Sequence, residues 1–163
     1  MITQDYLKQI FEYKNGKLIW KLKVSRKNNI GQIAGTKTVN LNNRYKVVGL
    51  NNKNYLLHRL IFAWHYGIFP KEIDHIDGNV LNNKIENLRI ATHEENQRNG
   101  KLRKNNNSGC KNVSYRKRDK VYHVSINVGG KVKHIGVFKD LELADLVAQE
   151  ARNKYHKEFA RHI

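Results

Sequence analysis

The segment KEIDHIDGNVLNNKIENLRIATHEENQRNG, residues 71–100, decides the fold of the first part of this chain. Its first piece, EIDHI (72–76), is short and alternating, a pattern typical of a strand end that presents Asp74 and His75. DGN at 77–79 predicts a tight turn, because Asp and Gly tolerate the backbone angles that turns require. The segment therefore opens with a strand and a turn.

The second piece of the segment predicts another strand and then a helix. NLRIA (87–91) alternates, with Leu88 and Ile90 expected to face inward. Thr92 and Glu95 fit a capping box, so we expect a helix to begin at Thr92 and to carry Asn96 in its first turns. A β-hairpin followed by a helix would bring Asn96 close to the Asp-His pair of the first strand.

This arrangement fits a metal-assisted reaction on phosphodiesters. Asp74 and Asn96 offer one carboxylate and one amide oxygen, and oxygen ligands suit Mg²⁺ or Mn²⁺. His75 is a candidate general base near neutral pH, and Asn87 is expected to hold the backbone of the histidine across the loop. The neighbouring asparagines, at 79, 82 and 83, are interpreted as turn residues without a chemical role.

The charge of the chain points to a polyanionic partner. Thirty-one Lys and Arg against 14 Asp and Glu give a formal net charge of +17 and a pI near 10.0. Residues 1–96 hold 15 basic and 8 acidic groups, and residues 97–163 hold 16 and 6, so both halves are basic. Nucleic acid is the expected partner. An anionic membrane is the alternative, but no basic amphipathic helix with an apolar face and no long apolar run is found.

Cysteine content and the N-terminal sequence indicate the compartment. Cys110 is the single cysteine, which excludes an internal disulfide and a multi-cysteine zinc site. The start, MITQDYLKQIFEYKNG, is polar and mixed in charge, unlike a secretory leader. We therefore expect a reducing, cytoplasmic location.

Two hairpins and a helix are expected before the opening segment. Thr3 can cap a short helix, and Asn15-Gly16 predicts a two-residue hairpin turn between FEYK and KLIWKL. A second hairpin is expected to turn at Asn51-Asn52. From about Leu57 the apolar spacing becomes helical, and Gly67 closes that element.

The C-terminal part predicts three strands and one helix. The strands are expected at 111–117, 121–128 and 131–138, with Gly129-Gly130 as a hairpin turn. Asp140 is expected to cap a helix that runs to about residue 156 with an apolar stripe. Before this module lies a basic, apolar-poor linker whose cations are candidates for phosphate contact: Lys101, Arg103 and Lys104.

The Asp74-His75 pair together with Asn87, Asn96 and the upstream HRL (58–60) resembles the HNH endonuclease family, particularly its phage and intron-encoded homing type. The resemblance covers about residues 55–99. It implies a ββα-metal fold, with His75 as general base, Asp74 and Asn96 as metal ligands, and Asn87 as the structural middle residue. The last position of the motif is Asn96 rather than histidine, which favours hard ions over zinc. The histidine at 93, one turn earlier, is an alternative ligand.

The second half resembles the AP2 DNA-binding domain over about residues 106–160, through SGCKNVSYRKRDKVYHVSI, GKVKHIGVFKDLELA and ARNKYHKEFA. The resemblance implies three strands whose exposed face enters the major groove. Alternation along the strands predicts four residues that contact bases or phosphates: Arg116, Arg118, Tyr122 and His134. Four lysines are expected to contact phosphates: Lys117, Lys120, Lys131 and Lys133. The family's tryptophans are replaced here, so base specificity does not carry over. Arg59 and Arg89 complete the candidate DNA contacts in the first half.

These observations predict a two-part basic α+β protein. We expect an HNH endonuclease domain at 1–99 with its ββα-metal motif at about 72–99, a basic linker at 100–108, and an AP2-like DNA-binding domain at 109–163. The expected activity is hydrolysis of double-stranded DNA to 5′-phosphate and 3′-hydroxyl ends by a protein that acts as a monomer on DNA, with a dimer as the alternative. Two alternatives stay open: a DNA-binding regulator with an inactive nuclease shell, and a non-specific HNH nuclease. The target site, the physiological metal, and nicking versus double-strand cleavage also stay open.

Overall fold

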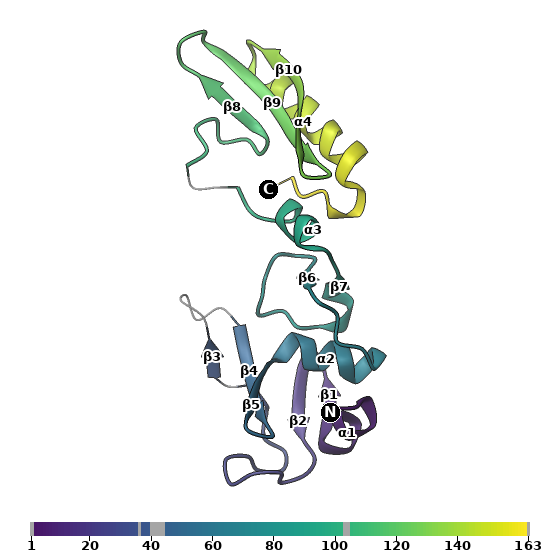
Figure 1. Ribbon diagram of the computed structural model, residues 1–163. Coiled ribbons are helices and arrows are strands. Elements are labelled where there is room, and N and C mark those ends of the chain that lie inside the picture. The colour runs from purple at the N-terminus through teal and green to yellow at the C-terminus, as the bar shows by residue number, and fades with distance from the viewer. Residues whose placement is uncertain (1, 36, 40–44, 103–104, 163) are drawn as a thin grey trace. The chain divides into compact units, whose positions relative to one another are not determined.

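A computed structural model describes residues 2–35, 37–39, 45–102 and 105–162 of the chain. It divides the chain into two compact units, Met1–Thr92 and His93–Ile163. Each unit mixes helices with small antiparallel sheets, as an α+β protein does (Figure 1). The first compact unit ends at Thr92. The domain boundaries expected from the sequence, at residues 99 and 109, stay a prediction.

The first unit opens with a capped helix and a hairpin. Helix α1 (Gln4–Ile10) begins after Thr3, whose Oγ1 accepts a hydrogen bond of 3.3 Å from the backbone N–H of residue 6. Strands β1 (Phe11–Lys14) and β2 (Lys17–Trp20) pair antiparallel around Asn15-Gly16, whose φ angles of 46° and 77° are those of a tight hairpin turn. Local sequence chemistry predicts both features correctly.

A second, three-stranded sheet follows, in the order β3-β4-β5. Its strands are β3 (Lys37–Val39), β4 (Tyr45–Leu50) and β5 (Lys53–Leu56), and the β4–β5 turn has positive φ at both of its asparagines. Helix α2 (Leu57–Tyr66) begins directly after β5 and ends at Gly67, which has a φ of 73°.

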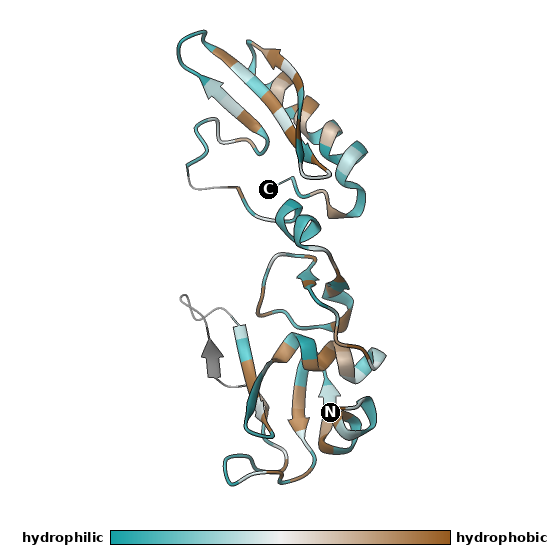
Figure 2. Cartoon of the chain, in the orientation of Figure 1, coloured by the Kyte–Doolittle hydropathy of each residue, from teal (hydrophilic) through white to brown (hydrophobic). Residues whose placement is uncertain are grey.

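Helix α2 supplies much of the core of the first unit. It buries most of its residues, among them Leu60 and Ile61 with no exposed surface, against α1, β4 and β5 in a core that also includes residues of β1 and β2. Figure 2 shows hydrophobic segments on β2 and α2 of this unit. A fully packed helix of this kind is a rigid support for the loop and hairpin that follow it.

The hairpin of the opening segment is shorter than its sequence pattern predicts. It consists of β6 (Ile73–His75) and β7 (Leu88–Ile90), preceded on the β7 side by the 3₁₀ turn η1 (Ile85–Asn87). Within β7, Leu88 is 6% exposed, whereas Ile90 is 54% exposed. The expectation that both leucine and isoleucine face inward is therefore wrong for Ile90, because the pairing ends at this residue.

The second unit begins with α3 (His93–Arg98) and continues as a sheet with a long helix. Strands β8 (Val113–Arg116), β9 (Val121–Val128) and β10 (Lys131–Phe138) lie in the order β10-β9-β8. Helix α4 (Leu141–His156) lies along one face of this sheet (Figure 1), and the 3₁₀ turn η2 (Lys157–Phe159) follows it. Asp140 caps α4 by accepting a 2.7 Å hydrogen bond from the N–H of Leu143.

The core of the second unit is small and lies between sheet and helix. Its buried members are Val113, Val124, Ala144 and Ala148. Because Val124 faces α4, alternation places every second residue of β9 on that side and the others on the open face. The register of β10 shifts between His134 and Gly136, which marks a β-bulge.

Among the residues that the structure describes, no helix combines the length and the apolar character needed to cross a membrane.

Candidate active site

Asp74 and His75 lie side by side on β6, and both are buried, with exposed fractions of 6% and 5%. Successive residues of a strand point to opposite faces, so the two side chains meet different neighbours. Buried polar groups need partners, because an unpaired one loses its hydration without compensation. The partners of these two side chains therefore describe the site.

The carboxylate of Asp74 is paired with the residue opposite it in the hairpin. Asp74 and Arg89 are register partners, and Oδ2 of Asp74 accepts from Nε of Arg89 at 2.8 Å and from its terminal nitrogen at 2.7 Å. The two side chains are 7% and 15% exposed, so water screens this pair little. Arg89, a candidate DNA contact by sequence, is placed against the proposed metal ligand.

His75 is held by an asparagine of the loop. Its Nε2 lies 3.0 Å from Oδ1 of Asn83, whose side chain belongs to a residue only 3% exposed. Because an amide oxygen only accepts, Nε2 must carry the proton, and the lone pair of the neutral ring is then on Nδ1. Asn83 thus selects the tautomer that presents a base at Nδ1.

The interpretation of Asn83 as a turn residue without a role is therefore wrong. No local signal separates it from its neighbours, since asparagine is common in turns and Asn82-Asn83 reads as turn chemistry. Only the closure of the loop onto β6 brings its amide to the ring of His75.

Asn87 closes the loop through two other residues. Its Oδ1 accepts from the backbone N–H of Asp77 at 3.0 Å, and its Nδ2 donates to Oδ1 of Asp77 at 2.9 Å and to the carbonyl of Asn82 at 2.8 Å. The prediction that Asn87 spans the loop is in keeping with these bonds, but its side chain bonds Asp77 rather than the backbone of His75. The nearest link to the histidine is the 2.9 Å bond from the N–H of Ile76 to the carbonyl of Asn87.

The charge of Asp77 is stabilised by this loop. Burial raises the pKa of the Asp77 carboxyl, but hydrogen bonds from the Asn82 side chain, the Asn79 backbone and the Asn87 side chain outweigh it. The net direction is a lowered pKa, so the carboxylate that bridges these asparagines is ionised at neutral pH. The loop after β6 is thus rigid through an anion and its amide donors.

A second histidine packs against His75. The ring of His58 on α2 lies 5.1 Å from that of His75 in an edge-to-face arrangement, and the ring of Tyr45 is 5.4 Å from His58. His58 is 6% exposed, and burial, followed by the charges of His75 and Arg59, lowers its pKa to about 3. The imidazole of His58 is therefore neutral at physiological pH.

Arg59 holds the chain that leads into β6. One of its terminal nitrogens donates a 2.8 Å hydrogen bond to the carbonyl of Pro70. This contact joins α2 to the loop before the hairpin. The contact is a packing role for Arg59, and its contact with DNA stays a prediction.

The remaining predicted ligand lies in the other unit. Asn96 is on α3, which belongs with His93–Ile163, whereas Asp74 belongs with Met1–Thr92. His93, the alternative ligand, has Nε2 at 2.8 Å from Nε2 of Gln97. Within the described residues no cluster of three or more His, Cys, Asp or Glu side chains offers a metal site. The assignment of Asp74 and Asn96 as metal ligands stays a prediction.

The candidate DNA contacts of the second unit fall on different faces of its sheet. Arg116 pairs with Val121, and His134 pairs with Ser125, so these side chains lie on the open face, opposite α4. The ring of His134 is 5.7 Å from that of His123.

Tyr122 lies on the helix side of the sheet, contrary to its predicted position. It pairs with Tyr115 and Phe138, and it packs against the core of the unit with its ring 4.9 Å from that of Tyr115. Lys133 shares this side, since its Nζ lies 4.8 Å from the ring centre of Tyr155 on α4. Tyr122 is on the same side of β9 as Val124, two positions later, whereas Arg116 is opposite Val121 on the open face.

The other basic candidates are solvent-exposed. Arg116 and Arg118 share the carboxylate of Asp119, at 3.4 Å and 2.8 Å, and have side chains 54% and 80% exposed. The exposed lysines among the candidates are Lys101, Lys117, Lys120, Lys131 and Lys133. Arg103 and Lys104 lie outside the described residues.

The sequence of the chain is similar to those of known proteins. The sequence model of the HNH endonuclease family matches residues 55–98, which include α2, β6, β7 and α3. The chain is 38% identical over 99 residues to Protein 3.8 of Escherichia phage T7, an alignment that covers 58% of this chain and 79% of that protein.

A second relative comes from Bacillus subtilis (strain 168) and is named "SPbeta prophage-derived putative HNH homing endonuclease YosQ". It is 41% identical over 59 residues, which are 32% of this chain and 34% of the relative. No solved structure matches the chain. The chain belongs to the family of Protein 3.8 of phage T7 and contains an HNH endonuclease domain.

Proposed function

We propose that the protein is a metal-dependent DNA endonuclease of the HNH homing type, with His75 as general base. The observation that carries the proposal is the 3.0 Å contact between His75 Nε2 and Asn83 Oδ1 inside the matched domain. This contact leaves the basic lone pair of the neutral ring on Nδ1, where a water could transfer its proton. A buried histidine with a selected tautomer is arranged for proton transfer rather than for packing alone.

The proposal assigns the divalent ion to Asp74 and Asn96. Their carboxylate and amide oxygens suit Mg²⁺ or Mn²⁺, and Arg89 engages Oδ2 of Asp74, which fixes the orientation of the carboxylate. When bound, the ion supplies a Lewis acid that stabilises negative charge on the phosphate and on the departing oxygen. Cleavage of this kind yields 5′-phosphate and 3′-hydroxyl ends.

Each protein group has a separate task in this proposal. Nδ1 of His75 takes the proton of the attacking water. Asn83 accepts a hydrogen bond from Nε2–H and so holds the ring in its orientation before and after the proton transfer. Asn87 and Asp77 hold the loop that carries Asn83 in one conformation. The ring of His58 packs 5.1 Å from that of His75 in an edge-to-face arrangement, which helps to keep the ring of His75 in place.

The second unit is proposed to bind DNA and to direct cleavage to a site. Residues 93–163 carry 16 Lys and Arg against 8 Asp and Glu, and Arg116, Lys117, Arg118 and Lys120 gather at one end of the sheet. One of the relatives is named as an HNH homing nuclease, which supports a role in site-directed cleavage. The proposed assembly on DNA is a monomer, since one chain carries one HNH domain.

Plasmid cleavage tests the nuclease proposal. Wild-type protein with Mg²⁺ or Mn²⁺ should convert supercoiled DNA to nicked or linear forms, and a chelator should stop the reaction. His75→Ala should reduce the single-turnover rate by about 10²–10⁴-fold without loss of DNA binding. His162→Ala serves as the control, since it removes a histidine of the second unit.

Two results would replace the proposal by its rivals. If wild type and His75→Ala bind DNA and leave it equally intact with every metal, the protein is a DNA-binding regulator with an inactive nuclease shell. If cleavage occurs but random DNA competes as well as any site, the specificity ratio is near one and the nuclease is non-specific.

The role of the basic end of the sheet has its own test. Arg118→Ala should weaken DNA binding about equally for all sequences and reduce the slope of log K against log salt by about 1. Lys154→Ala, on the solvent side of α4, is the matched loss of one exposed charge. An equal effect of the two substitutions would argue against a defined DNA surface at Arg118.

A further inference from the structure

The turn between β1 and β2 lies against the loop that carries Asn83. A Cβ atom placed on Gly16 would be 2.8 Å from the backbone nitrogen of Lys84 and 2.9 Å from the carbonyl carbon of Asn83. Side-chain carbons do not approach backbone atoms this closely, so the peptide between Asn83 and Lys84 occupies the space that a side chain at position 16 would need. The turn and the loop are therefore in direct contact.

The backbone conformation at Gly16 is a separate requirement for glycine. Its φ of 77° lies in the left-handed region, and together with Asn15 it closes the two-residue hairpin turn. The φ angle by itself explains a glycine in a turn of this type. It does not explain the lack of space for a Cβ, which comes from the loop.

The same hairpin reaches the loop at a second point. The backbone N–H of Ile85 donates a hydrogen bond of 3.0 Å to the phenol oxygen of Tyr13, a residue of β1. The ring of Tyr13 lies 5.8 Å from that of Trp64 and 4.4 Å from that of His65, both on α2. Aromatic packing thus fixes the side chain of Tyr13, which presents a hydrogen-bond acceptor to the loop.

These two contacts flank the residue that bonds the candidate base. Oδ1 of Asn83 lies 3.0 Å from Nε2 of His75. The peptide that follows Asn83 contacts Gly16, and the N–H of the second residue after it bonds Tyr13. Because a hydrogen bond weakens steeply with distance and angle, the bond to His75 depends on where this stretch of backbone is held.

The hairpin is a rigid support, since it is part of the main core of the first unit. Phe11 and Leu18 have no exposed surface, and Trp20 is 6% exposed. Most residues of the loop at 76–84 are exposed or half-buried. A close-packed core resists displacement, so the loop adapts to the hairpin rather than the reverse.

We infer that the β1–β2 hairpin positions the general base: Gly16 and Tyr13 hold the loop so that Asn83 accepts from Nε2 of His75. Both are positioning residues, because they act through Asn83. The inference rests on the proposed role of His75 in the nuclease reaction. It deepens that role by assigning the tautomer of His75 to a hairpin outside the matched HNH segment, which covers residues 55–98.

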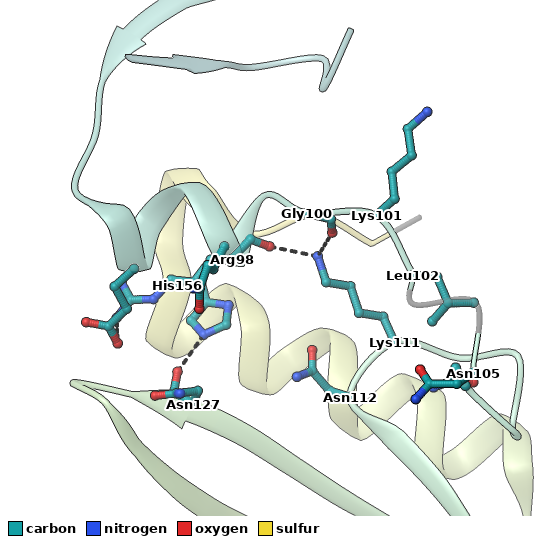
Figure 3. A pocket seen from close by; sticks show the side chains of 12 residues that line it. Arg98, Gly100, Lys101, Leu102, Asn105, Lys111, Asn112, Asn127 and His156 are labelled. Atoms are coloured by element: carbon teal, nitrogen blue, oxygen red, sulfur yellow. Dashed lines mark hydrogen bonds and ion pairs between the residues drawn. The ribbon is translucent and has the colours of Figure 1, made fainter. Parts of the chain in front are cut away.

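The second unit offers a comparison, because a side chain holds the backbone there as well. Beside a cavity of about 320 Å³, Lys111 donates from Nζ to the carbonyls of Arg98 and Gly100, at 2.7 Å each (Figure 3). Asn112 and His156 line the same cavity. Lys111→Met removes these bonds from the second unit, and it serves as a general control for the loss of a side-chain bond to the backbone.

Nuclear magnetic resonance of the histidine rings tests the inference on the full chain, without DNA and with a chelator present. The probe is the Nε2–H proton of His75, which is assigned by its loss in His75→Ala. In the wild type, the hydrogen bond to Asn83 should slow the exchange of this proton with water. Gly16→Ala and Tyr13→Phe should each accelerate this exchange by about 10-fold, the effect of one weakened hydrogen bond.

Each variant has a matched control in the same unit. Gly31 has a φ of 79°, and a Cβ placed on it would meet no described atom within 4 Å. Gly31→Ala therefore carries the backbone strain of Gly16→Ala without its contact. Tyr66→Phe removes the phenol oxygen of a tyrosine on α2 that is 58% exposed. These two controls and Lys111→Met should leave the exchange of the His75 proton as in the wild type.

Cleavage kinetics supply a second readout. A displaced base slows the chemical step and leaves binding unchanged, so Gly16→Ala and Tyr13→Phe should lower the single-turnover rate by about 10-fold at an unchanged Kd for DNA. A loss of stability alone would not separate the rate from the Kd in this way.

The outcomes decide between positioning and packing. The inference is overturned if the His75 proton exchanges in Gly16→Ala as in Gly31→Ala, or in Tyr13→Phe as in Tyr66→Phe. If Gly16→Ala shows no cooperative urea transition in tryptophan fluorescence, the two tyrosine variants decide alone. If the proton responds as expected while the wild type cuts no DNA with any metal, the nuclease proposal fails and the positioning inference stands.

Discussion

Two asparagine-rich stretches, the loop at 77–87 and the segment at 105–112, use the same residue type in opposite ways. In the first, the amides of Asn83 and Asn87 are bonded to His75, Asp77 and the backbone of the loop. In the second, Asn106 is likewise bonded to the backbone, but Oδ1 of Asn112 is buried beside a cavity with no partner in the described structure. Hydrogen bonds of the side-chain amides hold the first loop in one conformation, whereas the Asn112 oxygen adds no such bond to the second segment.

The largest expected effect comes from the buried ion pair beside His75. Arg89→Ala should lower the free energy of unfolding of the first unit by about 3–5 kcal/mol, because it leaves the buried carboxylate of Asp74 without its cation. Fluorescence during urea unfolding measures this unit alone, since both tryptophans, Trp20 and Trp64, lie in it.

Arg118→Ala is the control for this measurement, as the side chain of Arg118 is 80% exposed in the other unit. A loss below about 1 kcal/mol for Arg89→Ala would mean that the pair is effectively solvated. The Arg89–Asp74 pair would then contribute little to the stability of the first unit.

Acid should weaken the first unit through His58. Its folded pKa, about 3, is below the 6.5 of the unfolded chain, so between these values the unfolded state binds the extra proton. Stability should therefore be complete above pH 6.5 and fall as pH drops toward 3, by about 1.4 kcal/mol per pH unit from this group. His58→Gln should remove that part of the slope in urea titrations followed by tryptophan fluorescence. Equal slopes for variant and wild type would show that His58 titrates normally.

The contrast between the two asparagines can be measured directly. Asn83→Ala removes the buried amide oxygen that accepts from Nε2 of His75 and should lower the free energy of unfolding by about 1–3 kcal/mol. It should also slow plasmid cleavage by about 10–100-fold, as loss of the group that orients a functional histidine does. Asn112→Gly should change stability by less than about 0.5 kcal/mol. Thermal unfolding followed by circular dichroism compares both, and similar losses for the two variants would contradict the comparison.

Helix caps give the smallest and most local comparison. Asp140→Ala should lower stability by about 1 kcal/mol, because Asp140 caps the 16-residue α4 with a bond of 2.7 Å. Thr3→Ala should cost about 0.5 kcal/mol, since its bond on the seven-residue α1 is 3.3 Å long and exposed. Hydrogen exchange of the first-turn amides of α1 and α4 resolves the two helices. A larger effect at Thr3 than at Asp140 would contradict this ranking.

Much of the fold was predictable because its signals are local. Asn15-Gly16 and Gly129-Gly130 have the positive φ angles that their hairpin turns demand, and few other residues adopt them. Thr3 and Asp140 cap the helices expected to follow them. In each case the residue lies within a few positions of the turn or helix that it specifies, so the local sequence is enough to predict the structure.

The errors arise where pairing between distant segments decides the outcome. Alternation predicts Tyr122 on the open face, but its pairing with Tyr115 and Phe138 places it on the side of α4. The local sequence at Asn83 predicts only a turn residue. Its contact with His75 spans eight positions and depends on how the loop folds back, so no local pattern indicates it. The prediction that Ile90 is buried is wrong for a similar reason. The length of the β6–β7 pairing decides which residues of the strand are shielded from solvent.

The sequence alone determined the basic charge, the order of helices and strands, and the Asp74-His75 pair within the HNH motif, since these depend on composition and on local backbone preference. Tertiary structure decided the partners: Arg89 for Asp74, Asn83 for His75, and the cavity bordered by Asn112 and His156. The physical reason is that a hydrogen bond or a cavity requires atoms from separate segments to meet at about 3 Å, and sequence spacing does not encode that distance.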